Sequence, residues 1–277
     1  MIELIATDLD ETLLSSDKSI SERNLDAIQK AMGKGIIIVP ATGRGPNFLG
    51  DIPKQLGLDK ENNYSILANG ALTIDNKTKE IIDIKPLDFQ KAQKLYKLAY
   101  NKGLSMQIFT TDIAYYLRPD EIEINFANQF ENSYKIYEED NIDFLADTPI
   151  LKMAIIASDL NYLMSLEPDI AHLCNWNIQI SYSSDRYMEI NKKGVNKGLA
   201  LIKLCKKLNI PIGNTLAIGD NYNDKEMLEK AGTSVAVQNA HLLMKEISDY
   251  ITIATNNEGA VGEAIEKFVL QEKVKAQ

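Results

Sequence analysis

Short apolar segments alternate with helical patterns at both ends of this 277-residue chain. Residues 2–7 and 36–39 form two such segments near the N-terminus, and residues 216–218 and 234–237 form two more near the C-terminus. Short apolar segments separated by amphipathic helical stretches are typical of parallel strands buried between two layers of helices. The sequence therefore predicts an α/β fold with a Rossmann-like parallel sheet that is built from both ends of the chain.

The middle of the chain has a different pattern. Two strand-like segments, residues 104–109 and 113–117, follow each other closely, and further strand-like and helical segments continue to residue 187. Closely spaced strands favour antiparallel hairpins, because parallel neighbours need a long crossover between them. We therefore expect residues 1–82 and 188–277 to form the α/β domain, and residues 83–187 to form an α+β domain inserted into it.

Two aspartates stand where the first strand is expected to end. Asp8 and Asp10 come directly after the apolar run that ends at Thr7. In an extended backbone, residues i and i+2 face the same side, so these two carboxylates are expected to share one site. Neighbouring carboxylates repel each other unless a cation offsets their charge, and Mg²⁺ prefers such oxygen ligands. The alternative is a surface turn, in which Asp, Glu and Thr are also common.

Polar residues follow other predicted strands as well. Thr42 and Gly43 follow the second strand, the acidic segment at residues 219–224 follows a strand near the C-terminus, and Lys197 stands at the start of a helix. Each of these alone is explained by an ordinary turn or helix cap. The carboxyl ends of parallel strands, however, meet at one edge of a sheet, where ligands bind. Together the residues predict one site, with carboxylates for a metal and with hydroxyl, backbone N–H and amine groups for an anion.

Composition argues against several classes of function. The net charge is −9 and no basic block occurs, so nucleic acid and anionic membranes are poor partners. The two histidines, His172 and His241, lie in apolar surroundings, which argues against a histidine triad or a zinc site. Cys174 and Cys205 lack the spacing of a zinc site and are expected to be buried thiols in a reducing compartment. No secretory signal or membrane span is evident in the sequence, so we expect a cytoplasmic protein.

Four segments carry a recognisable motif each. They read Asp8-Leu9-Asp10-x-Thr12-Leu13-Leu14, Ala41-Thr42-Gly43-Arg44, Gly194-Val195-Asn196-Lys197-Gly198 and Gly219-Asp220-x-x-Asn223-Asp224. In this order they resemble the motifs of the haloacid dehalogenase-like phosphatases, and in particular those of the Cof-type hydrolases. The insertion between the second and third segments resembles the α+β cap of that subgroup, so the resemblance covers the whole chain. It implies a core domain with a cap, and Mg²⁺-dependent hydrolysis of phosphate monoesters.

The resemblance also implies a role for each matching residue. Asp8 would be the nucleophile that becomes an aspartyl-phosphate, and Asp10 would act as general acid and base. The residues that would bind the phosphoryl group are Leu9, Thr42, Gly43, Lys197 and Asn223. The residues that would hold the Mg²⁺ are Asp8, Asp10 through its backbone carbonyl, Asp220 and Asp224. The expected substrates are small soluble metabolites such as sugar phosphates or phosphorylated cofactors, and no particular oligomeric state is indicated.

Glu11 departs from the family pattern, which most often has glycine at this position. A glutamate adds a negative charge beside a phosphate site and restricts a sharp turn. We expect it to point away from the phosphate, because Asp8, Asp10 and Thr12 are all retained. Two other functions share the scaffold, namely a phosphotransferase or mutase and a non-enzymatic phospho-receiver. Asp10 argues against the receiver, whose phosphoaspartate must persist.

Overall fold

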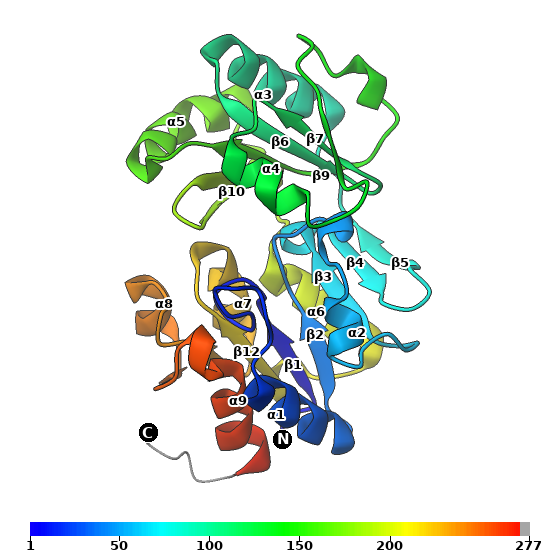
Figure 1. Ribbon diagram of the computed structural model, residues 1–277, viewed down its shortest axis with the longest axis vertical. Helices are drawn as coiled ribbons and strands as arrows, with labels where there is room; N and C mark the ends of the chain where they lie inside the picture. The colour runs from blue at the N-terminus through cyan, green and yellow to red at the C-terminus, as the bar shows by residue number, and fades with distance from the viewer. Residues whose placement is uncertain (272–277) are drawn as a thin grey trace.

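A five-stranded parallel sheet organises one of the two units of the molecule. The computed structural model describes residues 1–271, and the two units lie one above the other in Figure 1. The lower unit has the strand order β14-β13-β12-β1-β2, and every pairing in this sheet is parallel. Its strands are β1 (Leu4–Thr7), β2 (Ile37–Pro40), β12 (Thr215–Gly219), β13 (Thr233–Ala236) and β14 (Tyr250–Ile251). The sheet joins the first strands of the chain to the last, so the predicted α/β fold is confirmed.

Helices enclose this sheet. All four residues of β1 are buried, and because successive side chains of a strand point to opposite faces, both faces of the sheet are covered there. Helix α1 packs against α9, and α6 packs against α7. The helices of this unit are α1 (Glu22–Gly33), α2 (Ile52–Gln55), α6 (Lys197–Leu208), α7 (Lys225–Lys230), α8 (Leu242–Ile247) and α9 (Ala260–Ile265).

The upper unit contains a six-stranded sheet with the strand order β10-β11-β9-β6-β7-β8. Its pairings are antiparallel except for that between β7 and β8. The strands are β6 (Ser105–Thr110), β7 (Ala114–Leu117), β8 (Tyr134–Ile136), β9 (Ile150–Ile156), β10 (Ile178–Ser183) and β11 (Tyr187–Lys192). Helices α3 (Phe89–Lys102) and α5 (Leu160–Leu173) lie on the side of the sheet away from the lower unit (Figure 1), and a short α4 (Glu121–Ala127) follows β7. The mixed α+β character predicted for the middle of the chain is confirmed.

A small antiparallel sheet connects the two units. It consists of β3 (Tyr64–Leu67), β4 (Leu72–Asp75) and β5 (Ile81–Ile84), with β4 in the middle. A parallel bridge between Ala41 and Ile66 places β3 beside the end of β2. The sheet therefore extends the edge of the lower unit.

The expected limits of the inserted domain, residues 83 and 187, both fall inside strands. The first would divide β5, which pairs with β4, and the second would detach Tyr187 from β11, which pairs with β9 and β10 from its first residue onward. A strand cannot be divided between two independently packed units without losing its ladder of hydrogen bonds. We therefore propose that the inserted unit comprises residues 86–192, and we call these residues the insertion below.

Aromatic side chains pack between the insertion and the lower unit. The ring of Phe48 lies 5.8, 5.9 and 5.5 Å from the rings of Phe109, Phe126 and Phe130 respectively, measured between ring centroids. Such edge-to-face and stacked pairs add to the free energy gained by burying the rings. Tyr222 also bridges the units, because it packs against the apolar cores of both.

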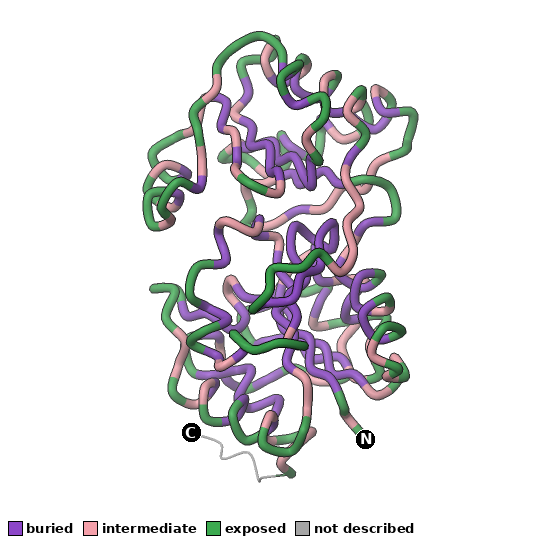
Figure 2. Tube along the Cα trace, turned by 90° about the vertical axis from the view of Figure 1, so that its right-hand side faces the viewer, coloured by how far each residue is buried: buried purple, intermediate pink, exposed green. Residues whose placement is uncertain are grey.

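Buried chain fills the centre of each unit (Figure 2), where two separate hydrophobic clusters form their cores. The cysteines Cys174 and Cys205 are buried free thiols, as expected. Among the helices of residues 1–271, none is both long and apolar enough to span a membrane.

Candidate active site

The predicted site residues lie together at the carboxyl edge of the five-stranded sheet. Asp8 directly follows β1, Asp220 directly follows β12, and Thr42 lies two residues beyond the end of β2. Because these strands are parallel neighbours in register, their ends bring the three residues to one place. The insertion lies over this edge of the sheet (Figure 1).

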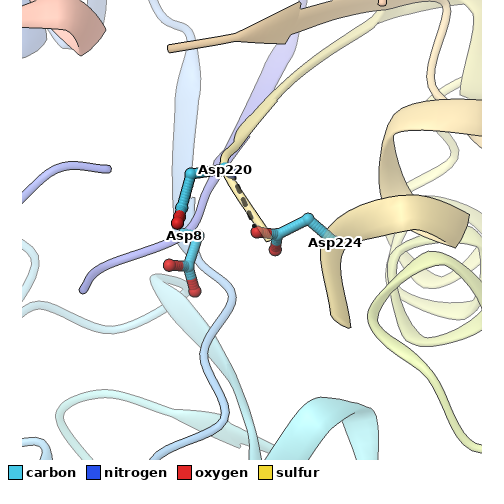
Figure 3. Close-up of side chains that lie close together, drawn as sticks. All are labelled: Asp8, Asp220 and Asp224. Carbon is cyan, nitrogen blue, oxygen red and sulfur yellow. Dashed lines mark hydrogen bonds between the residues drawn. The ribbon is translucent and has the colours of Figure 1, made fainter. Parts of the chain in front are cut away.

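Three carboxylates form the centre of the site (Figure 3). Asp8, Asp220 and Asp224 are buried, and one oxygen of each lies within 4.8 Å of the others. The carboxylate of Asp224 accepts hydrogen bonds of 3.1 Å from the backbone N–H groups of Asp220 and Asn221. The hydroxyl of Thr12 donates to the carboxylate of Asp220 at 2.6 Å. These bonds fix the orientation of two of the three carboxylates.

Lys197 supplies the positive charge of the cluster. It begins α6, and its Nζ donates to Oδ1 of Asp8 at 2.5 Å and to Oδ1 of Asp224 at 2.6 Å. Its side chain is completely buried. Burial alone would lower the pKa of Lys197, but the charges of Asp224 and Asp8 outweigh this effect and hold the pKa above its ordinary value. The lysine is therefore a permanent cation in the site.

One ammonium group does not balance three carboxylates. Burial raises the pKa of Asp8 to about 7, assisted by the charges of Asp224 and Asp10 and opposed by Lys197. Burial, together with the charges of Asp8 and Asp224, also raises the pKa of Asp220 well above its usual range. Burial is the main cause of both shifts, and the neighbouring carboxylates add to it.

The donor set of this cluster fits a hard divalent cation. Mg²⁺ binds carboxylate and carbonyl oxygens, and the three carboxylates here offer only such oxygens. A bound dication would also offset the negative charges that add to the effect of burial on the pKa values of Asp8 and Asp220.

Asp10 lies apart from these three carboxylates. Its two oxygens accept hydrogen bonds from Arg44, at 2.8 Å from Nε and 2.7 Å from Nη2, and Lys18 donates to it at 3.0 Å. Asp10 is not one of the three clustered carboxylates, since β1 ends at Thr7 and the chain turns directly afterwards. That Asp8 and Asp10 serve one site stays a prediction. Burial would raise the pKa of Asp10, but Arg44 and Lys18 prevail and lower it to about 2.

Arg44 in turn contacts the insertion. Its guanidinium carbon lies 5.4 Å from the centroid of the Phe126 ring and 6.0 Å from that of Phe130. Its Nη1 donates to the backbone carbonyl of Phe48 at 3.0 Å. The side chain that holds Asp10 is thus itself held at the boundary between the two units.

The residues predicted to bind the phosphoryl group surround the same edge of the sheet. Leu9 lies in the turn after Asp8, and Thr42 is buried with its hydroxyl accepting a hydrogen bond from the backbone N–H of Arg44 at 3.1 Å. Gly43 follows at the start of the next loop, and Asn223 lies close to it: a Cβ atom at Gly43 would lie 3.5 Å from Nδ2 of Asn223. The structure thus gathers polar groups beside the carboxylate cluster, on the side towards the insertion.

Four further polar residues adjoin the site without having been predicted. Thr12 orients Asp220, and a buried group of three side chains, Asn69, Lys152 and Glu189, contacts Gly43 and Asn223. Thr12 belongs to the motif that begins at Asp8, so its hydroxyl could have been assigned to the site from the sequence. The other three are brought together from distant parts of the chain, and no local pattern marks them.

Glu11 is not one of the clustered carboxylates, and its carboxylate lies 3.7 Å from Nζ of Lys18. That it points away from the phosphate stays a prediction. Its carboxylate accepts a hydrogen bond from the side-chain amide of Asn256 at 3.2 Å, and its backbone carbonyl accepts one from Asn239 at 2.8 Å. Its φ of 58° lies in the left-handed region, where glycine is at no disadvantage. This backbone conformation gives a physical reason for a preference for glycine at this position.

Comparison with known proteins gives a consistent result. The family model of the haloacid dehalogenase-like hydrolases matches residues 5–265. A protein of Streptococcus pyogenes that carries a phosphatase name is 31% identical over 97% of this chain and 99% of its own length. The 5-amino-6-(5-phospho-D-ribitylamino)uracil phosphatase of Bacillus subtilis is 29% identical over 97% of this chain and 96% of its own length.

Solved structures agree with the sequence relatives. A haloacid dehalogenase-like hydrolase from B. subtilis superposes with a TM-score of 0.86 and 26% identity, covering 97% of this chain and 100% of the other. A second hydrolase of this kind, from Bacteroides thetaiotaomicron, superposes with a TM-score of 0.82 and 28% identity, covering 96% of this chain and 99% of the other. Both units of the molecule therefore have counterparts in the same solved structures.

Proposed function

Because this chain belongs to the haloacid dehalogenase-like hydrolase family and is a Cof-type phosphatase, we propose that it hydrolyses phosphate monoesters of small metabolites through an aspartyl-phosphate on Asp8, with Mg²⁺ as its cofactor. The observation that carries this proposal is the buried cluster of Asp8, Asp220 and Asp224 with Lys197. It combines a carboxylate nucleophile, ligands for a cation and a fixed positive charge within a few ångströms.

In the first step, an oxygen of Asp8 attacks the phosphorus atom, and the bond between phosphorus and the leaving oxygen breaks. The leaving oxygen needs a proton, which Asp10 would supply as general acid. Water then attacks the phosphorus atom of the aspartyl-phosphate while Asp10 takes a proton from that water. The bond between phosphorus and the Asp8 oxygen breaks, which releases inorganic phosphate and restores the Asp8 carboxylate. In the conformation described, Arg44 and Lys18 hold Asp10 as an ionised carboxylate, so Asp10 must turn from these cations and take up a proton from water before it can protonate the leaving oxygen.

The remaining residues bind and orient the groups that react. Thr42, the backbone N–H groups of Leu9 and Gly43, the amide of Asn223 and the ammonium group of Lys197 would hold the phosphoryl oxygens, on which charge is spread in the transition state. Asp8, Asp220, Asp224 and the backbone carbonyl of Asp10 would hold the Mg²⁺. When bound, the cation would offset the negative charges of the carboxylates and of the phosphoryl group.

The experiment that tests this proposal is release of phosphate from p-nitrophenyl phosphate with and without Mg²⁺. We expect activity that needs the cation and is lost in Asp8→Asn. Activity that persists in EDTA or in Asp8→Asn would overturn the mechanism. Transfer of the phosphoryl group to an added sugar at the expense of free phosphate would instead favour a phosphotransferase, and a stable phosphoprotein without turnover would favour a receiver.

A screen of phosphorylated metabolites at one concentration then narrows the substrate class. It includes sugar phosphates and the ribitylaminouracil phosphate named for the B. subtilis relative. We expect the highest kcat/KM for a small soluble monoester. A cytoplasmic location stays a prediction from the sequence.

A further inference from the structure

A buried ion pair of the insertion reaches down to the loop that begins with Gly43. Lys152 on β9 and Glu189 on β11 form this ion pair, and both side chains are almost fully buried. Nζ of Lys152 also donates to the backbone carbonyl of Gly43 at 2.6 Å. Two neighbouring strands of the insertion therefore hold one of the proposed phosphate-binding groups of the lower unit.

The same ion pair continues to Asn223 through a relay of hydrogen bonds. One oxygen of Glu189 pairs with Lys152, and the other accepts from Nδ2 of Asn69 at 2.7 Å. Oδ1 of Asn69 then accepts from Nδ2 of Asn223 at 3.2 Å. Because a carboxylate can only accept, it fixes which end of the Asn69 amide faces Asn223. That choice turns the Asn223 nitrogen towards Asn69 and leaves the second hydrogen of this nitrogen for another acceptor.

Gly43 fits tightly into this arrangement. A Cβ atom at this position would lie 3.1 Å from Oδ1 of Asn69, 3.2 Å from Oε1 of Glu189 and 3.5 Å from Nδ2 of Asn223. Three polar side chains from three parts of the chain thus converge on one Cα atom. The close approach indicates that the relay and the Gly43 loop fix each other's positions.

We propose that Lys152, Glu189 and Asn69 are positioning residues, which hold Gly43 and Asn223 in the geometry that binds the phosphoryl group. The phosphate pocket is then complete only while the insertion sits on the lower unit as it does here. This inference rests on the proposed function, because it assigns phosphate binding to Gly43 and Asn223. It differs from a substrate-specificity role, since none of the three residues needs to touch the leaving group.

The variant that tests the relay is Asn69→Gly. Asn69 has a φ of 58°, which glycine adopts without strain, and the Lys152–Glu189 pair remains complete in this variant. The matched control is Asn47→Ala, which removes another asparagine hydrogen bond between the units, from Nδ2 of Asn47 to the backbone carbonyl of Asp112. Binding of inorganic phosphate in the presence of Mg²⁺ is measured by calorimetry, and kcat/KM is measured for p-nitrophenyl phosphate and for a sugar phosphate.

We expect Asn69→Gly to weaken phosphate binding about tenfold and to lower kcat/KM for both substrates by that same factor. Asn47→Ala is expected to change phosphate binding less than about twofold, because its hydrogen bond is exposed and goes to Asp112, not to any residue of the relay. Unchanged phosphate binding in Asn69→Gly would overturn the inference. An equal loss of phosphate affinity in Asn47→Ala would overturn the inference, because the relay would then act only by holding the two units together. Unequal losses of kcat/KM for the two substrates would overturn it as well, because they would show that Asn69 contacts the leaving group.

A second variant keeps the test decisive if Asn69→Gly does not fold. Glu189→Gln retains the size of the side chain but only one acceptor oxygen, whereas Glu189 uses both of its oxygens. We expect it to weaken phosphate binding about three- to tenfold, and unchanged binding would overturn the inference. Failure of the proposed function is seen separately, because the unchanged protein would then release no phosphate from any substrate.

Discussion

Two buried groups of charged side chains lie close together in this molecule and are built differently. Asp8, Asp220 and Asp224 share one lysine, whereas Lys152 and Glu189 form a balanced pair. Burying unpaired charge is costly, and the raised pKa values of Asp8 and Asp220 express that cost in the first group. The unbalanced group needs a ligand to complete it, while the balanced pair is complete as it stands. The balance of charge thus distinguishes a group that binds a ligand from a group that holds neighbouring residues in place.

The largest effect is expected for Asp8→Asn. Loss of the nucleophile should lower turnover by at least about 10³-fold, measured as phosphate release at saturating substrate. The same change removes one of the excess negative charges, so the metal-free variant should be at least as stable as the unchanged protein in urea. A marked loss of stability in the metal-free variant would contradict an excess of negative charge in the cluster, because the cluster would then depend on Asp8 for its structure.

Lys152→Met tests the balanced pair. Removing the lysine leaves Glu189 buried without its counter-charge, and we expect the free energy of unfolding to fall by about 3–5 kcal/mol in urea. The double variant Lys152→Met/Glu189→Met should recover most of that loss, since replacing both members of a buried pair by apolar groups is often neutral. If the double variant is no more stable than the single one, Lys152 does not act by offsetting the charge of Glu189.

Mg²⁺ should stabilise the folded protein by binding to the cluster of Asp8, Asp220 and Asp224. Mass action predicts a gain of about 2.7 kcal/mol in the free energy of unfolding at a cation concentration of one hundred times Kd. Thermal unfolding with and without Mg²⁺ measures this gain, with Asp220→Asn as the variant in which it should shrink. A Tm that does not move with Mg²⁺ in the unchanged protein would contradict the metal site.

A third group of buried charged side chains, Glu123 with Asp120 and Arg186, makes the stability of the protein depend on pH. Buried Glu123 lies beside Asp120 and Arg186. Burial and the hydrogen bond between the side chains of Glu123 and Asp120 raise the pKa of Glu123 from 4.5 to about 7, against the charge of Arg186. Its contribution to stability is therefore complete below pH 4.5 and is lost as the pH rises to about 7. Relative to Glu123→Gln, the metal-free protein should lose on the order of 1 kcal/mol over that interval. If the free energy of unfolding in urea changes with pH in the same way in both proteins, the raised pKa of Glu123 is refuted.

The smallest effect is expected for Glu11→Gly. Glu11 contacts Asn256 and Lys18 and is not one of the three clustered carboxylates, so kcat should change by less than about threefold. Glycine relieves the left-handed backbone but loses the bond to Asn256, and these changes should nearly cancel in the free energy of unfolding. A large gain in turnover would show that Glu11 reaches the phosphate after all.

Much of the site could be predicted because its residues follow strands directly. The apolar run before Asp8 and the one before residue 220 mark two strand ends, and parallel strands bring their ends together. The orientation of Asp10 could not be predicted in this way, because it depends on a turn after β1 and on Arg44. The relay through Glu189 and Asn69 joins residues 120 positions apart, and no periodicity within either segment encodes such a contact.

The order of the chain has a consequence for how the site comes into being. The hydroxyl of Thr12 bonds to Asp220, 208 positions later, and β1 receives its neighbour β12 only after the whole insertion has been made. Contacts that span such distances slow folding, and a chain that emerges from its N-terminus first must wait for its last third. Half-made chains therefore hold Asp8 without Lys197, Asp220 or Asp224, so a chain whose synthesis stops before these residues lacks the carboxylate cluster and its lysine.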